Sequence, residues 1–149
     1  MNALLTMVAL WLSTNFALQT GDAQPRIERR PPAEIAALHR GVPLTAAHST
    51  GPGDQAASDD IVSVYDDETR IIYLREDWTG RTPAELSVLV HEMVHHFQNV
   101  AGLKYACAGE REKLAYEAQE RWLGLFGRDL ASEFRIDPFS RLVKTQCIY

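Results

Sequence analysis

The chain has 149 residues, of which 46% are hydrophobic and 23% are charged. This length fits one globular domain, and the balance is ordinary for a chain that packs a single core. The formal net charge of −5 argues weakly against nucleic acid or an anionic membrane surface as the main partner, because both favour basic patches. The sequence contains neither a phosphate-binding G-x-x-x-x-G-K-[ST] loop nor an internal repeat.

The first residues have the pattern of an export signal. Residues 3–12 are almost entirely apolar, and this run is too short to span a bilayer but suits the apolar part of a secretory signal. Gly21 and Ala23 then supply small residues at the −3 and −1 positions of a cleavage site after Ala23. We therefore expect residues 1–23 to be a signal peptide, and the mature chain to be exported (periplasmic or secreted) without a stable membrane span. A buried N-terminal helix is the alternative.

Residues 24–60 are predicted to hold one short helix and one mobile loop. The helix covers about residues 32–40, where a proline pair favours its start and Gly41 its end. Residues 41–60 are rich in Gly, Pro, Ser and Asp, which is typical of a loop, and His48 within it is expected to be solvated.

Residues 61–149 are predicted to form an α+β domain that begins with a β-hairpin. Two short runs of β-branched and aromatic residues, 61–65 and 71–74, are separated by the polar loop 66–70. We expect the small antiparallel sheet of this hairpin, over about 61–74, to pack on the helices that follow.

Two long helices are predicted after the hairpin. The first covers about residues 83–99 and begins with a T-x-x-E capping box made by Thr82 and Glu85. Its apolar residues recur at helical spacing, as do those of the second helix, over about residues 109–126. The remaining tail is predicted to add one short helix before Pro138.

The cysteines Cys107 and Cys147 suit an oxidising compartment. A disulfide between them would close a loop of about 40 residues and stabilise the fold by roughly 2–4 kcal/mol, because it restricts the unfolded chain. It would also tie the C-terminal tail to the start of the second long helix. Two buried free thiols are the alternative.

The first long helix carries the pattern His-Glu-x-x-His at His91, Glu92 and His95. Histidines four residues apart on a helix point the same way, about one turn apart, as two ligands of one tetrahedral Zn²⁺ must. Glu92 is rotated by about 100° from His91, where a general base takes a proton from metal-activated water. Two histidines on a half-buried helix face, with a solvated Glu92, are the alternative.

The second long helix offers a carboxylate as third ligand. Glu112 lies three residues before the apolar Ala115, so helical phase turns it toward the buried stripe. Glu110 and Glu117 share a different face of the helix. We therefore expect Glu112 to be the ligand, with Glu110 and Glu117 as the alternatives.

The string HEMVHHFQ resembles the active-site helix of zincin metallopeptidases. The metzincin branch has Gly and His where this chain has Gln98 and Ala101, so that branch is disfavoured. The gluzincin branch takes a Glu from a downstream helix, and residues 112–115 are similar to its E-x-x-[AS]-[DN] pattern. Tyr116 departs from the acid or amide of that pattern. Over residues 61–126 the chain also looks like small exported bacterial zincin-like domains of unknown function.

The resemblance implies a minimal zincin-like domain that hydrolyses peptide bonds in a peptide or protein substrate. His91, His95 and Glu112 would bind Zn²⁺, and Glu92 would be the general base. Tyr116 is a candidate to hold an imidazole or to donate to an oxyanion, and Tyr73 and Tyr105 are further candidates for the oxyanion. The alternative functions are a non-catalytic exported module that binds zinc for folding or partner recognition, and a metal-free interaction domain.

Overall fold

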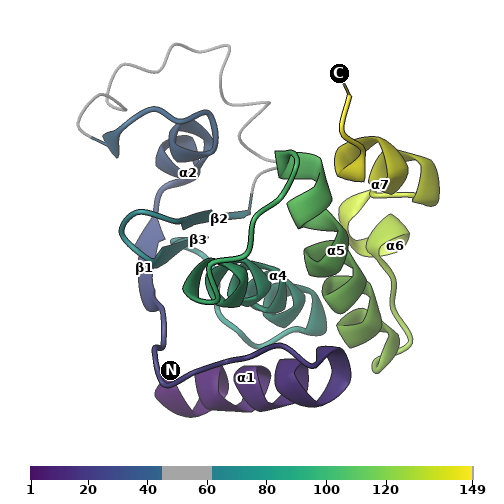
Figure 1. Cartoon of the computed structure of the whole chain (residues 1–149), viewed down its shortest axis with the longest axis horizontal. Helices are drawn as coiled ribbons and strands as arrows, with labels where there is room; N and C mark the ends of the chain where they lie inside the picture. The colour runs from purple at the N-terminus through teal and green to yellow at the C-terminus, as the bar shows by residue number, and fades with distance from the viewer. Residues whose placement is uncertain (45–61, 149) are drawn as a thin grey trace. The chain divides into compact units, whose positions relative to one another are not determined.

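The computed structural model describes residues 1–44 and 62–148 (Figure 1). The chain divides into two compact units. One unit comprises Met1–Gln24 and Gly80–Tyr149, and the other comprises Pro25–Thr79. A small mixed sheet and several helices confirm the predicted α+β class. Within the described ranges, none of the helices has the length and apolar character needed to cross a membrane. The predicted mobile loop lies largely outside the described residues: its residues 45–60, which include His48, are not described.

The unit Pro25–Thr79 is built on a three-stranded sheet in the order β1-β3-β2. The hairpin predicted from the sequence is present: β2 (Ser63–Asp66) pairs with β3 (Ile71–Arg75) in antiparallel fashion. β1 (Arg26–Arg30) pairs with the other edge of β3 in parallel, with Ile27 opposite Ile72. The antiparallel hairpin was predicted, but the sheet is mixed, because the third strand, β1, was not predicted. Every residue of β1 except Ile27 is charged, which hides the strand from a search for apolar alternation.

A helix and a small apolar core complete this unit. The predicted helix is present as α2 (Pro32–His39), with proline at its first position. Its Ile35 is fully buried and forms a core with Ile71 and Tyr73 of β3. This cluster gives the short sheet the covered apolar face that a few strands need for stability.

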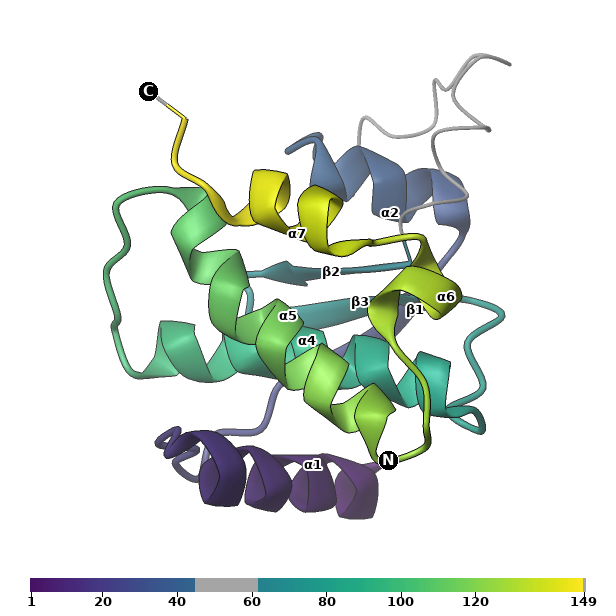
Figure 2. The ribbon, with the colours of Figure 1, turned by 90° about the vertical axis from the view of Figure 1, so that its right-hand side faces the viewer.

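In the other unit, the two predicted long helices are α4 (Pro83–Val100) and α5 (Ala108–Gly124), which lie across one another (Figure 2). The predicted capping box starts α4: the Glu85 N–H donates to Thr82 Oγ1, and the Thr82 N–H donates to Glu85 Oε2, each at 3.1 Å. The buried apolar residues of α4 are Val88, Leu89, Val90, Met93, Val94 and Phe97. This apolar face fixes the rotation of α4 and therefore the direction of its polar side chains.

The segment predicted to be a signal peptide contains a helix, α1 (Asn2–Phe16), that packs against α4 in the same unit. The Trp11 ring meets the Trp122 ring of α5 edge to face, with centroids 5.2 Å apart. After α1, the backbone oxygen of Ala23 lies 2.7 Å from Nε2 of His96. Cleavage of this segment after Ala23 stays a prediction.

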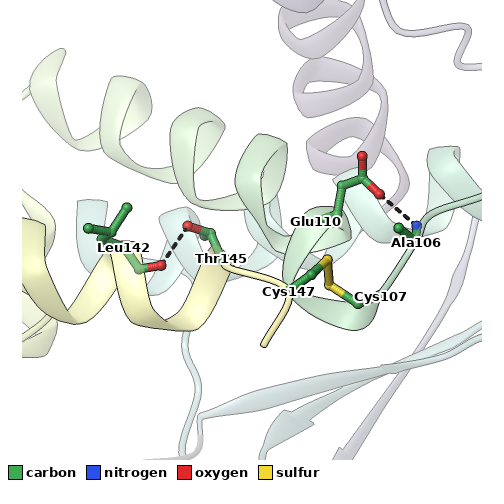
Figure 3. Close-up of a disulfide and its surroundings, with 6 residues drawn as sticks. All are labelled: Ala106, Cys107, Glu110, Leu142, Thr145 and Cys147. Atoms are coloured by element: carbon green, nitrogen blue, oxygen red, sulfur yellow. Dashed lines mark hydrogen bonds between the residues drawn. A yellow bond between two sulfur atoms is a disulfide. The ribbon is translucent and has the colours of Figure 1, made fainter. Parts of the chain in front are cut away.

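The chain ends with two short helices, α6 (Leu130–Phe134) and α7 (Pro138–Thr145). α6 lies where the sequence predicts a helix before Pro138, whereas α7 was not predicted. The Cys107–Cys147 disulfide is present and ties the residue after α7's C-cap to the N-cap of α5, which confirms the predicted pairing (Figure 3). A Cβ at Gly109 would lie 2.6 Å from the backbone oxygen of Gln146, so the tail lies directly on the first turn of α5.

Candidate metal centre

Two imidazoles from α4 and one carboxylate from α5 converge on a common point. Nε2 of His91 lies 3.2 Å from Nε2 of His95. The carboxylate of Glu112 bridges both rings, with Oε2 at 3.0 Å from His91 Nε2 and Oε1 at 3.1 Å from His95 Nε2. The i,i+4 spacing on α4 places the two rings one turn apart, and the packing of α5 across α4 brings Glu112 to them.

These separations are close to the spacing of zinc ligands. Zinc binds imidazole nitrogen at about 2.0–2.1 Å, so the ligand atoms of a tetrahedral site lie about 3.3–3.4 Å apart. The three observed separations of 3.0–3.2 Å are only slightly shorter. Two imidazoles and a carboxylate are also a ligand set that zinc accepts with a fourth position left open. The residues His91, His95 and Glu112 therefore fit a zinc ion.

The electrostatics of the cluster favour a cation. Burial would raise the pKa of Glu112, but hydrogen bonds from His91 and His95, with their charges, hold it well below its usual range. Burial would lower the pKa of His95, but the hydrogen bond and charge of Glu112, with the charge of Glu92, raise it above its ordinary value of 6.5. The carboxylate is therefore ionised at neutral pH, and it attracts positive charge to the space between the rings.

A glutamine side chain also contacts Nδ1 of each imidazole, the ring nitrogen that faces away from the cluster. Nδ1 of His91 lies 3.0 Å from Oε1 of Gln119, and Nδ1 of His95 lies 3.0 Å from Oε1 of Gln98. Neither glutamine was predicted from the sequence as a partner of these histidines. Helical spacing offers a signal for both, because Gln98 is three residues after His95 and Gln119 is two turns after Glu112.

Glu92 lies beside the cluster without contributing a ligand atom to it. Its side chain is buried, with only 5% of the residue exposed. Its negative charge contributes to raising the pKa of His95 and of Tyr116, so it acts on both residues at close range. This position suits a group that exchanges protons with a water at the cluster.

Tyr116 contacts the first imidazole through its ring. The rings of Tyr116 and His91 meet edge to face with centroids 4.8 Å apart, while His91 Nδ1 is taken by Gln119. Burial, with the charges of Glu112 and Glu92, raises the pKa of Tyr116 well above its ordinary value of 10.0, so its hydroxyl keeps its proton. Its role as an oxyanion donor stays a prediction, as does that of Tyr105.

The structure separates the three carboxylates considered for the third ligand. Glu110 Oε2 accepts a hydrogen bond from the Ala106 N–H at 2.6 Å, in the turn before α5 (Figure 3). Glu117 is exposed. In the described part of the chain, the group that could hold a metal is formed by His91, His95 and Glu112.

The family model of a domain of unknown function (DUF6647) matches residues 1–147. The chain belongs to this family. The DUF6647 match spans α1, both helices of the cluster and the disulfide. No curated protein and no solved structure matches the chain.

Proposed function

We propose that this DUF6647 protein is a zinc-dependent peptidase with a gluzincin-like ligand set in a minimal zincin-like domain. The observation that carries the proposal is the convergence of His91, His95 and Glu112, with Glu92 beside them. A His-Glu-x-x-His helix and a downstream glutamate are the pieces that metal-assisted hydrolysis of an amide needs.

The residues divide the chemistry between them. His91, His95 and Glu112 would hold the ion, which when bound supplies a water acidic enough to act as nucleophile and a Lewis acid for the scissile carbonyl. Glu92 accepts the proton of that water and passes it to the leaving amine nitrogen. Tyr116, which stays protonated, donates to the oxyanion that forms on the carbonyl oxygen.

Export is part of the proposal. The Cys107–Cys147 disulfide suits an oxidising compartment such as the periplasm or the extracellular space. A peptidase in such a compartment acts on peptides or exported proteins.

The test combines zinc content with cleavage of a fluorogenic peptide library. We expect the wild-type chain to bind one zinc and to cleave peptides. Glu92→Gln should keep the zinc and lose about 10²–10⁴-fold in kcat, because the proton acceptor is gone. Glu117→Gln makes the same chemical change at an exposed position of α5 and should cleave normally.

A non-catalytic zinc-binding module is the alternative, and the burial of the cluster favours it: His95 is only 6% exposed and Glu92 only 5%. Zinc-loaded wild type that cleaves nothing in the library, or Glu92→Gln that cleaves as fast as wild type, would favour this module over the peptidase.

A further inference from the structure

A chain of hydrogen bonds runs from His91 back to the start of α4. Gln119 Oε1 lies 3.0 Å from His91 Nδ1, Gln119 Nε2 lies 3.2 Å from Ser87 Oγ, and Ser87 Oγ lies 2.7 Å from the backbone oxygen of Ala84. A carbonyl oxygen only accepts, so the single hydroxyl hydrogen of Ser87 is used on Ala84. Ser87 Oγ therefore accepts from the amide N–H of Gln119. The amide oxygen of Gln119 then faces His91, and His91 Nδ1 must donate to it.

A second chain fixes the other imidazole in the same way. Gln98 Nε2 lies 3.1 Å from the backbone oxygen of Arg111, which can only accept. This orients the amide of Gln98, so its oxygen faces His95 Nδ1 at 3.0 Å. His95 Nδ1 must therefore donate as well.

Both chains have the same consequence at the cluster. A neutral imidazole carries one N–H, so a hydrogen held on Nδ1 leaves a lone pair on Nε2. When both imidazoles are neutral, the Nε2 atoms of His91 and His95 and the carboxylate of Glu112 are therefore all acceptors, separated by 3.0–3.2 Å. Acceptors at this distance repel one another unless a cation lies between them.

We propose that Gln98 and Gln119 are positioning residues that hold both imidazoles in the tautomer and orientation required by a divalent cation. This inference rests on the proposed function in taking that cation to be zinc. Ser87, Gln98 and Gln119 are 0%, 1% and 4% exposed, so water does not compete for these hydrogen bonds.

The two chains also tie the ligand geometry to the packing of the helices. Gln119 comes from α5 and reaches Ser87 on α4, whereas Gln98 comes from α4 and reaches Arg111 on α5. Arg111 Nη2 in turn donates to the backbone oxygen of His95 at 3.3 Å. The helix that supplies Glu112 is therefore bonded, through the same amides, to the helix that supplies both histidines.

The chemistry of the amide group distinguishes this arrangement from a carboxylate partner. A carboxylate behind a histidine makes the imidazole a stronger base and adds negative charge near the ion. A glutamine supplies the acceptor without that charge. Gln119→Glu should therefore keep the hydrogen bond to His91, whereas Gln119→Leu removes it.

The experiment measures zinc affinity by competition with a chromophoric chelator. We expect Gln119→Leu and Gln98→Leu to bind zinc about 10- to 100-fold more weakly than wild type. Gln119→Glu should bind zinc at least as tightly as wild type. Leu123→Ala truncates a fully buried side chain of α5 that belongs to neither chain of hydrogen bonds. It is the control for an effect of lowered stability on zinc binding. Its zinc affinity should equal that of wild type.

Nitrogen-15 spectra of the imidazoles give a second, site-by-site readout. In zinc-loaded wild type, both Nδ1 hydrogens should be visible and protected from exchange with water. Gln119→Leu should deprotect only that of His91, and Gln98→Leu only that of His95. Unchanged affinity in both leucine variants, or protection lost without this pairing, would overturn the inference while leaving the proposed function standing.

The two proposals fail in distinguishable ways. If the wild-type chain takes up no zinc, the proposed function is wrong, and the spectra of the metal-free protein at alkaline pH still decide the tautomers. Hydrogens on both Nδ1 atoms would support the positioning role of Gln98 and Gln119, and hydrogens on Nε2 would overturn it.

Discussion

Oε1 of Glu112 on α5 lies 3.1 Å from Nε2 of His95 on α4. Glu112 raises the pKa of His95, and His95 lowers the pKa of Glu112, so each residue favours the charged form of the other. In the metal-free protein a proton therefore occupies the region where the proposed ion would bind. This competition between proton and metal gives the cluster a measurable dependence on pH.

Stability of the metal-free protein should change with pH in a defined direction. The pKa of His95 is raised above 6.5, so its contribution to the free energy of unfolding is complete below pH 6.5 and is lost as pH rises through the raised value. The pKa of Glu112 is lowered from 4.5, so its contribution is present above pH 4.5 and is lost as pH falls through the lowered value. The pair should therefore stabilise the metal-free fold most between about pH 4.5 and 6.5.

Zinc affinity should show the opposite trend, because binding must displace the proton from His95. Denaturant unfolding with chelator and with zinc, at pH 5, 6, 7 and 8, measures both effects. Glu112→Gln should flatten the dependence between pH 6 and 8 in the metal-free protein. A wild-type dependence identical to that of Glu112→Gln would contradict the coupling.

Tyr116→Phe should lower kcat without lowering zinc affinity. The phenyl ring keeps the edge-to-face contact with His91, and only the hydroxyl proposed to donate to the oxyanion is lost. Loss of one such donor typically costs about 10²–10³-fold in kcat. Steady-state kinetics beside zinc titration checks this, and Tyr105→Phe tests the second tyrosine proposed as an oxyanion donor in this unit. Full activity in Tyr116→Phe would assign the oxyanion to another donor.

The disulfide should stabilise the C-terminal tail more than the cluster. Cys107→Ser with Cys147→Ser should lower the free energy of unfolding by about 2–5 kcal/mol, because the unfolded chain regains the freedom of the closed loop. Glu112 contacts His91 and His95 of α4 directly, so we expect zinc affinity to change little. Reductant should destabilise the wild type and leave the double variant unaffected; equal sensitivity of both would contradict the assignment.

Two glycines of α5 offer a matched pair of substitutions. A Cβ at Gly109 would lie 2.6 Å from the Gln146 backbone oxygen, whereas a Cβ at Gly124 meets nothing within 4 Å. We expect Gly109→Ala to destabilise the fold by about 1–3 kcal/mol through this clash. Gly124→Ala should be neutral or stabilise by up to about 1 kcal/mol, because alanine favours the helix. Thermal unfolding of the two variants with the disulfide intact measures both effects on stability. Equal effects would contradict the close packing of Gln146 on Gly109.

The sequence predicted those elements whose signals are local. The capping box of Thr82 and Glu85 and the apolar period set the start and rotation of α4, and the spacing of His91 and His95 follows from them. Glu112 was preferred over Glu110 and Glu117 by helical phase alone, and the structure brings it to the histidines.

What the sequence did not predict depends on contacts between distant residues. β1 is almost wholly charged and is a strand because it pairs with β3, so no alternating pattern reveals it. The role of Gln119 needs the α4–α5 packing, since its partners His91 and Ser87 lie on the other helix. Tyr116 was considered as the partner of His91, and only the arrangement of side chains assigns His91 Nδ1 to Gln119.

The most direct test of the account is zinc quantification in the purified wild-type chain beside His95→Ala and Glu112→Ala, with Glu110→Ala as the control. We predict one zinc per chain for wild type and Glu110→Ala, and loss of bound zinc in the other two variants. A wild-type chain that holds no zinc after exposure to it, or that holds it equally well without His95 and Glu112, would contradict the metal centre.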